Sequence, residues 1–143
     1  MKQVFKSISI VILLVFVSFL NIECRDDLSS ENLLIGSWTH SPEEQTESGI
    51  LIYRPTHFKQ YPPSWYRNTF FLNGDNTCDY LALAANDGHF FEKGSWDYNE
   101  DSKILTISYI RTDPTPHIPK ENVVLKFEVM SLEKNMLKLK SIS

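Results

Sequence analysis

The sequence predicts an all-β domain, an up-and-down antiparallel meander of about eight strands that forms a closed or half-open barrel. No window keeps a helical period of 3.6 apolar residues over three turns. Short segments in which apolar and polar residues alternate recur instead, with turn residues between them. Most connections are too short for a parallel crossover. Eight twisted strands with one apolar face remove their exposed edges when they close.

Eight strands are expected along the chain. They cover residues 33–40, 49–54, 65–72, 77–84, 89–98, 103–110, 122–130 and 136–141. Alternation is clearest in the last three, which indicates one apolar face and one wet face. In the fifth segment Phe90, Trp96 and Tyr98 share one parity, which places them inward.

The N-terminus has the pattern of an export signal. Lys2 and Lys6 precede an apolar run from Ile8 to Leu20, and a basic region followed by an apolar region of this length is typical of a signal peptide. The run is shorter than the roughly 20 apolar residues of a spanning helix; an uncleaved signal anchor is the alternative. We therefore predict a signal peptide over 1–23, a flexible polar tether over 24–32 and the barrel over 33–143.

Cys24 follows the apolar run directly, and residues 19–23 lack the small side chains that an ordinary signal peptidase needs. The segment thus resembles the signal of a bacterial lipoprotein, in which the cysteine becomes the lipid-bearing N-terminus. The resemblance implies an exported protein of the bacterial cell envelope, held at a membrane by a lipid on Cys24. Cys78 then has no disulfide partner, and we interpret it as a buried free thiol.

Composition argues against several classes of function. The leader contains two of the chain's 14 basic and one of its 18 acidic residues, so the remainder has a net charge of about −5 and no basic patch for nucleic acid. No G-x-S-x-G, HExxH or phosphate-loop motif is present, so we expect neither an enzyme nor a cofactor. His57, His89 and His117 follow no metal-ligand spacing, so no metal site is predicted.

Three short motifs carry a further resemblance. Gly36 and Trp38 form a G-x-W step, 71–75 reads Phe-Leu-Asn-Gly-Asp, and 94–96 reads Gly-Ser-Trp. In this pattern the chain resembles the small bacterial lipocalin-like domains. The resemblance implies a barrel that holds a small hydrophobic ligand. Gly-Ser-Trp occurs twice, which we interpret as coincidence rather than duplication, and both Trp side chains are expected in the core.

A meander brings alternate loops to the same end. Loops 55–64, 85–88 and 111–121 then share one end, with six of the seven prolines. The tether is expected to enter at that end. Loop 41–48 falls at the opposite end, where its carboxylates are expected to be solvated.

Three interpretations of the proline-rich end remain open. In the first interpretation this end is the mouth of a ligand site, in which Arg54 or Arg67 holds a carboxylate and Tyr53, Trp65 and Phe71 form apolar walls. Alternatively, it is the docking face of a cell-envelope interaction or inhibitor module, with Tyr61 and Trp65 as anchors. In the third interpretation the loops only cover the barrel, and the arginines pair with acidic neighbours. The first interpretation requires an interior cavity.

Overall fold

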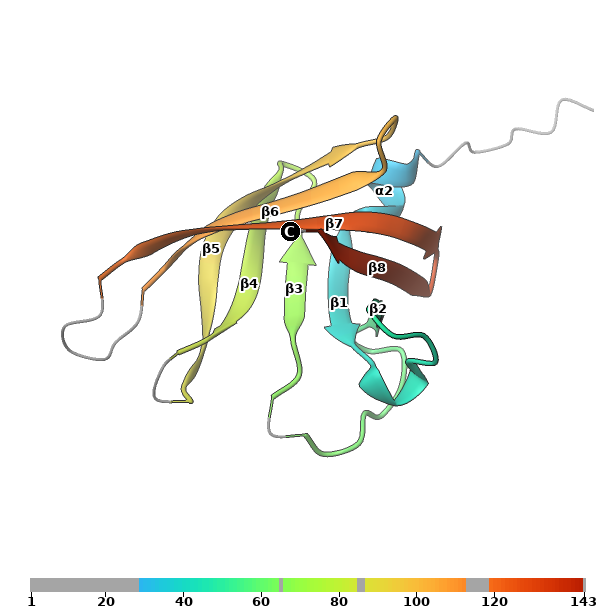
Figure 1. Cartoon of the computed structure of the whole chain (residues 1–143), viewed down its shortest axis with the longest axis horizontal. Coiled ribbons are helices and arrows are strands. Elements are labelled where there is room, and N and C mark those ends of the chain that lie inside the picture. Colours follow the sequence, from blue (N-terminus) through green and yellow to red (C-terminus); the bar gives the residue numbers. More distant parts are fainter. Residues whose placement is uncertain (1–28, 65, 85–86, 113–118, 143) are drawn as a thin grey trace, which may run out of the picture.

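The computed structural model describes residues 29–64, 66–84, 87–112 and 119–142 and shows a closed antiparallel barrel (Figure 1). The eight strands are β1 (Gly36–His40), β2 (Ile50–Pro55), β3 (Thr69–Leu72), β4 (Thr77–Leu83), β5 (His89–Asn99), β6 (Ile104–Arg111), β7 (Glu121–Glu133) and β8 (Met136–Ile142). A short helix, α2 (Ser30–Leu34), precedes β1, and a 3-10 turn, η2 (Pro42–Glu44), follows it. The predicted all-β barrel of eight strands is confirmed.

Strand order departs from sequence order at one place. Strands β3 to β8 pair successively as an up-and-down meander, whereas β1 lies between β2 and β3 and pairs with both. Strand β2 then closes the barrel against β8, with Leu51 opposite Leu139. Strands β2 and β3 therefore run in the same direction, on either side of β1.

The connection 56–68 makes this order possible, because about a dozen residues suffice for a crossover between strands of one direction. It passes over the outer face of β1. Thr39 points outward there, yet it is 5% exposed, and its hydroxyl lies 2.9 Å from that of Thr56 and 3.2 Å from that of Thr69. The length of this segment was the sequence signal for a crossover rather than a turn.

The crossover reverses the expected direction of the first two strands. Loop 41–49 lies at the same end as the β4–β5 and β6–β7 connections, which we call the loop end. Helix α2 and the turns 73–76 and 100–103 lie at the other end, the helix end (Figure 1). The expectation that the chain enters beside the proline-rich loops is therefore wrong, and so is the placement of loop 41–48 at the opposite end.

Helix α2 replaces the start of the predicted first strand. The Ser29 hydroxyl caps it by accepting the Asn32 N–H at 3.4 Å. Leu34 is fully buried, and its carbonyl accepts the Trp38 indole N–H at 2.8 Å. Five residues are too few to show a helical period, so the sequence pattern misassigned 33–34 as strand and 30–32 as tether.

The core fills the helix-end half of the barrel. Its fully or almost fully buried side chains include Leu34, Trp38, Phe70, Leu72, Cys78, Trp96, Leu105, Ile107, Leu137 and Leu139. Both Trp side chains lie in this core, as predicted, and the Trp96 indole donates to the Asn73 carbonyl at 2.9 Å. The hydrophobic effect of this packing holds one end of the barrel closed.

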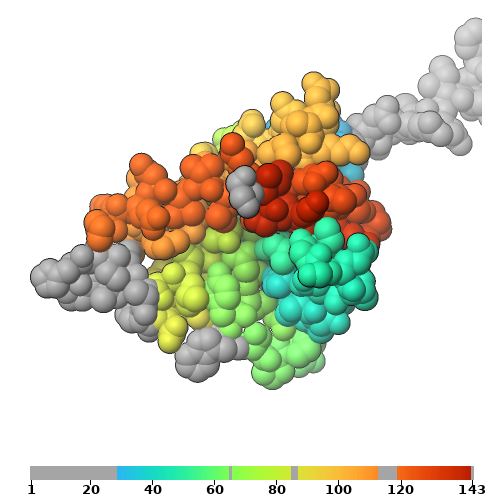
Figure 2. Space-filling view, viewed as in Figure 1, coloured from blue at the N-terminus to red at the C-terminus, as the bar shows by residue number. Residues whose placement is uncertain are grey.

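Gly94 marks the point where β5 leaves β6. The β5–β6 ladder begins at Gly94 opposite Tyr109, whereas β5 continues back to His89 beside β4 only. A β-carbon on Gly94 would lie 2.2 Å from the Ser108 carbonyl oxygen, so only glycine permits this approach. Figure 2 shows β6 and β7 extending as an arm past the body of the barrel.

Phe90 shares the inward parity of Trp96 and Tyr98, as expected, and lies opposite the buried Ala82. It is nevertheless 40% exposed, because β5 has left β6 at this point, whereas Trp96 is buried and Tyr98 packs against the core. No helix within the described ranges is long and apolar enough to cross a membrane. The predicted signal segment and Cys24 lie outside the described residues.

Candidate functional site

An open cavity of about 310 Å³ occupies the loop-end half of the barrel, above the filled core. The strands supply inward-facing side chains to its wall, and the end of the crossover connection adds two more. The lining residues are His40, Leu51, Tyr53, Tyr66, Asn68, Tyr80, Leu125, Phe127 and Ser141. The barrel is thus filled at one end and hollow at the other.

Asn68 organises the polar side of the cavity. It is 9% exposed and accepts the Tyr53 hydroxyl at 2.8 Å, while its amide donates to the Tyr66 hydroxyl at 3.0 Å. Tyr66 in turn donates to the Leu81 carbonyl at 2.8 Å. This chain of hydrogen bonds ties the end of the crossover to β2 and β4 and fixes the orientation of two tyrosine rings.

Aromatic rings form much of the wall. The Tyr80 ring stacks 4.8 Å from that of Tyr109 and lies parallel to Phe70 at 6.4 Å. Tyr53 packs against Phe70 at 4.9 Å. Burial raises the pKa of Tyr53 and Tyr80, so both hydroxyls stay protonated at neutral pH.

His40 ends β1 at the rim of the cavity, with its ring 5.3 Å from that of Tyr53. Burial lowers the pKa of His40 and outweighs a hydrogen bond to Gln45 that favours the charged form. The imidazole is therefore neutral at neutral pH. Its Nε2 atom is buried and has no hydrogen-bond partner in the described structure.

Two charged side chains point inward near this cavity without lining it. Glu92 is 7% exposed, and its carboxylate accepts the Thr112 N–H at 2.6 Å and the Thr112 hydroxyl at 2.8 Å. Arg111 forms an ion pair with Glu121 at 3.1 Å. Glu92 thus ties β5 to the chain after β6 where the ladder between them is absent.

The predicted ligand residues do not meet at one mouth. Tyr53 points into the cavity, as that interpretation requires. Arg54 and Phe71 point outward, and Phe71 packs against Phe91 at 5.5 Å. Arg67 lies in the crossover connection, and Trp65 lies outside the described residues. Alternation along a strand explains the separation, because neighbours such as Tyr53 and Arg54 face opposite sides.

Both arginines belong to a group of charges that we call the crossover cluster: Glu43, Glu44, Arg54, Lys59 and Arg67. Arg54 pairs with Glu44 at 2.7 Å, Arg67 pairs with Glu43 at 2.9 Å, and Lys59 contacts both carboxylates. Arg67 also donates to the His40 carbonyl at 2.8 Å. The cluster fastens loop 41–49 to the crossover, so Glu43 and Glu44 are not simply solvated, contrary to expectation.

Tyr61 is also held by this cluster. Its hydroxyl donates to the Pro55 carbonyl at 2.9 Å, and the Arg67 guanidinium lies 5.1 Å from its ring centre. Tyr61 is therefore half-buried within its own loop. The docking-face interpretation expected an exposed anchor at this position.

We expect the crossover cluster to make stability depend on pH. Burial alone would raise the pKa of Glu43, but hydrogen bonds from Arg67 and Lys59 outweigh it and lower the pKa to about 2. A carboxyl whose pKa is lower in the folded state stabilises the fold above its ordinary pKa of 4.5, and this contribution disappears as the pH falls toward 2. Glu43→Gln should cost about 1 kcal/mol at neutral pH, since partly exposed ion pairs are screened.

The measurement is urea unfolding of wild type and Glu43→Gln across this pH range. The difference in free energy of unfolding should shrink toward zero as the pH approaches 2. Glu47→Gln, which removes an exposed carboxylate from the same loop, is the control and should leave stability unchanged. A difference between wild type and Glu43→Gln that is constant with pH would contradict the prediction.

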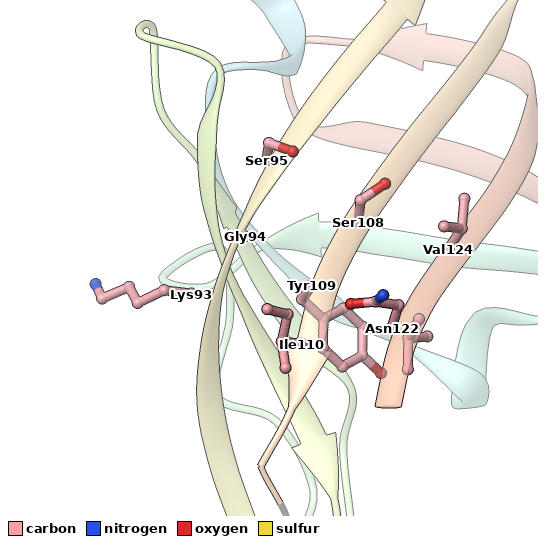
Figure 3. A pocket seen from close by; sticks show the side chains of 9 residues that line it. Lys93, Gly94, Ser95, Ser108, Tyr109, Ile110, Asn122 and Val124 are labelled. Carbon is pink, nitrogen blue, oxygen red and sulfur yellow. The ribbon is translucent and has the colours of Figure 1, made fainter. Parts of the chain in front are cut away.

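A second hollow, of about 470 Å³, lies on the outer face of β5, β6 and β7. Figure 3 shows Ser95, Ser108 and Val124 in a row across these strands, with Ile110 and Asn122 further along β6 and β7, beyond the last pair of the β5–β6 ladder. Val124 is 58% and Ile110 51% exposed. This groove is larger, but it lacks the interlinked polar groups of the interior cavity, so we take the interior cavity as the candidate site.

The described residues contain no group of three His, Cys, Asp or Glu side chains placed to hold a metal ion. His117 lies outside the described residues. Cys78 is a buried free thiol, as predicted, and burial raises its pKa to about 11. A thiol with so high a pKa is a poor nucleophile at neutral pH.

Sequence reasoning missed most of the cavity wall. Strand parity could have predicted that Tyr80 and Phe127 face the interior, because each shares a face of its strand with buried neighbours. Tyr66 and Asn68 carried no such signal, since they precede β3 in an irregular stretch. Their role depends on the crossover, which places this stretch beside the end of β1, where the His40 N–H donates to the Asn68 carbonyl at 2.9 Å.

No family model, curated protein or solved structure gives a significant match to this chain.

Proposed function

We propose that this protein binds a small amphiphilic molecule in the loop-end cavity of its barrel. The observation that carries the proposal is the combination of an open interior hollow with an ordered wall. Tyr53, Asn68 and Tyr66 are fixed by hydrogen bonds to one another, while Leu51 and Phe127 supply apolar surface. Ligand sites are typically concave, mostly apolar and equipped with a few well-placed polar groups.

The separation of the two halves of the barrel supports this proposal. Trp38, Trp96 and their neighbours close the helix end, so stability does not depend on filling the loop end. A ligand would then enter at the loop end, beside loop 41–49. Hydrogen bonds already hold the wall in place, so little conformational freedom is lost when a ligand binds.

The proposal extends to the place of action. The basic residues and apolar run before Cys24, which resemble a lipoprotein signal, support export to the bacterial cell envelope and attachment through a lipid on that cysteine. A barrel joined to the membrane by a short segment would meet amphiphilic molecules near the membrane surface. The chain enters the barrel at the helix end, so the cavity opens at the opposite end.

Two variants on β8 test whether a molecule is bound in the cavity. Ser141→Trp places an indole in the cavity, because Ser141 lines it. Lys140→Trp places the same ring on the outer face, because the neighbouring residue points the other way. Full-length wild type and both variants are purified, and co-purifying small molecules are identified by mass spectrometry. We expect a molecule retained by wild type and Lys140→Trp and depleted at least tenfold from Ser141→Trp.

Two results of this search would contradict ligand binding in the cavity. One is that all three proteins retain the same molecules in equal amounts. The other is that none of them retains any molecule. Because Lys140→Trp adds the same side chain, a loss confined to Ser141→Trp cannot be attributed to an extra indole on the surface.

A further inference from the structure

We propose that the ligand is a compact, uncharged aromatic molecule with a hydrogen-bonding group, and that carboxylates and long alkyl chains are disfavoured. This inference rests on the proposed function and names the ligand class for the same cavity. It differs from the sequence-based expectation, in which an arginine holds a carboxylate. Three properties of the cavity carry it: the absence of free charge, the closed floor and the aromatic wall.

The lining offers no charge to a ligand. Its nine residues, all within the described structure, include no Asp, Glu, Lys or Arg. His40 is the only titratable base among them, and burial lowers its pKa. A carboxylate moved into this cavity would lose water without gaining an ionic partner, and an unpaired buried charge is strongly unfavourable.

The charged groups nearby are already engaged. Arg54 and Arg67 belong to the crossover cluster, where Glu44 and Glu43 hold them. Glu92 accepts two hydrogen bonds from Thr112. Arg111 forms an ion pair with Glu121 through one terminal nitrogen, while its buried Nε atom has no hydrogen-bond partner in the described structure. Arg111 does not line the cavity, so a carboxylate in the cavity would meet no free cation there.

The floor of the cavity limits the length of the ligand. Phe70 and Leu139 are fully buried below it, and the tightly packed core continues to the helix end. A volume of about 310 Å³ is at the lower limit for ligand sites. A bicyclic ring fits this space better than an extended chain.

The wall favours a planar ring with a polar edge. Tyr53, Tyr66 and Tyr80 present aromatic surface, and aromatic pairs gain energy beyond simple burial. At the rim, the buried Nε2 atom of His40 has no hydrogen-bond partner within the described structure. A buried polar atom without a partner is costly. A hydroxyl on the ligand would supply the missing hydrogen bond once the His40 ring turns and presents Nε2 to the cavity.

Isothermal titration calorimetry on the full-length chain tests the ligand class with three matched probes. They are 2-naphthol, 2-naphthoate and decan-1-ol. Compared with 2-naphthol, 2-naphthoate has a negative charge, and decan-1-ol has an alkyl chain in place of the aromatic rings. We expect 2-naphthol to bind at least tenfold more tightly than either of the others at neutral pH. Lys140→Trp should keep this binding and Ser141→Trp should abolish it. Any partition of the probes into the detergent used for purification would be the same for both variants, so it cannot explain such a difference.

The outcomes separate this inference from the proposed function. If 2-naphthoate or decan-1-ol binds as tightly as 2-naphthol and Ser141→Trp blocks it, the cavity binds ligands but the proposed class is wrong. If Ser141→Trp leaves the binding of every probe unchanged, or if no probe binds, both proposals fail for this cavity.

His40→Phe tests the polar contact separately, because phenylalanine keeps a ring beside Tyr53 but removes Nε2. The variant should weaken binding of 2-naphthol roughly three- to tenfold, the range expected for one hydrogen bond. Binding of naphthalene, which lacks the hydroxyl, should not change. Equal effects on the two probes would show that His40 acts through packing alone and would overturn the assigned contact.

Discussion

Gly94→Ala is expected to destabilise the barrel by about 3 kcal/mol, at the upper end of the usual cost of overpacking. The added β-carbon would lie 2.2 Å from the Ser108 carbonyl oxygen and 3.0 Å from the Tyr109 β-carbon. The closest atom belongs to the backbone of β6, so no side-chain rotation can relieve the overlap. The two strands must separate where their ladder begins. The free energy of unfolding in urea measures the effect.

Gly74→Ala is the matched control for this substitution. Gly74 lies in the turn between β3 and β4, and its added β-carbon would meet only the Ile35 side chain at 3.5 Å, an ordinary contact. We expect a change of less than about 0.5 kcal/mol there, as for most surface substitutions. Equal destabilisation by the two substitutions would show that the close approach at Gly94 is unimportant.

Cys24→Ala is expected to abolish incorporation of a fatty-acid label and to release the protein from the membrane fraction. The expectation follows from the position of Cys24 after the apolar run, where a lipoprotein signal places its lipid-bearing cysteine. Stable attachment requires more than one acyl chain, and a protein without them has no comparable anchor. Metabolic labelling and sedimentation of membranes, performed on wild type and variant together, measure both effects.

Cys78→Ala controls for the loss of a thiol as such. Cys78 is 1% exposed in the core, so it is inaccessible in the folded protein. This variant should keep its label and still sediment with membranes. Labelling of Cys24→Ala at the wild-type level, or continued sedimentation without label, would contradict the lipid anchor; the second result would favour an uncleaved apolar segment as the anchor.

The strands themselves were predictable because their signals are local. Leu105, Ile107 and Tyr109 alternate with polar residues, and all three are buried in β6. The turn at Asn73 and Gly74 was likewise evident from residue type. Strand order was not predictable in this way, because pairing between β1 and β3 depends on the route of 56–68 rather than on any short motif.

The site could be predicted only in part, for the same reason. Strand parity predicts that Tyr53 faces inward. Nothing in the sequence showed that its neighbour Arg54 would form an ion pair with Glu44 on the outer face. That ion pair requires loop 41–49 to fold back over β2, which follows from the reversed direction of the first strands. Asn68 became part of the site through the same rearrangement.

The strand order also determines how late the barrel can close during folding. Strands β1, β2 and β3 can associate early, because all their residues lie within the first 72 of the chain. The last seam joins Ile50 to Lys140, ninety residues further along. Until β8 has emerged, β2 and β7 both present unpaired edges, and such edges are prone to pairing with other chains. The final strand therefore both completes the barrel and protects it from aggregation.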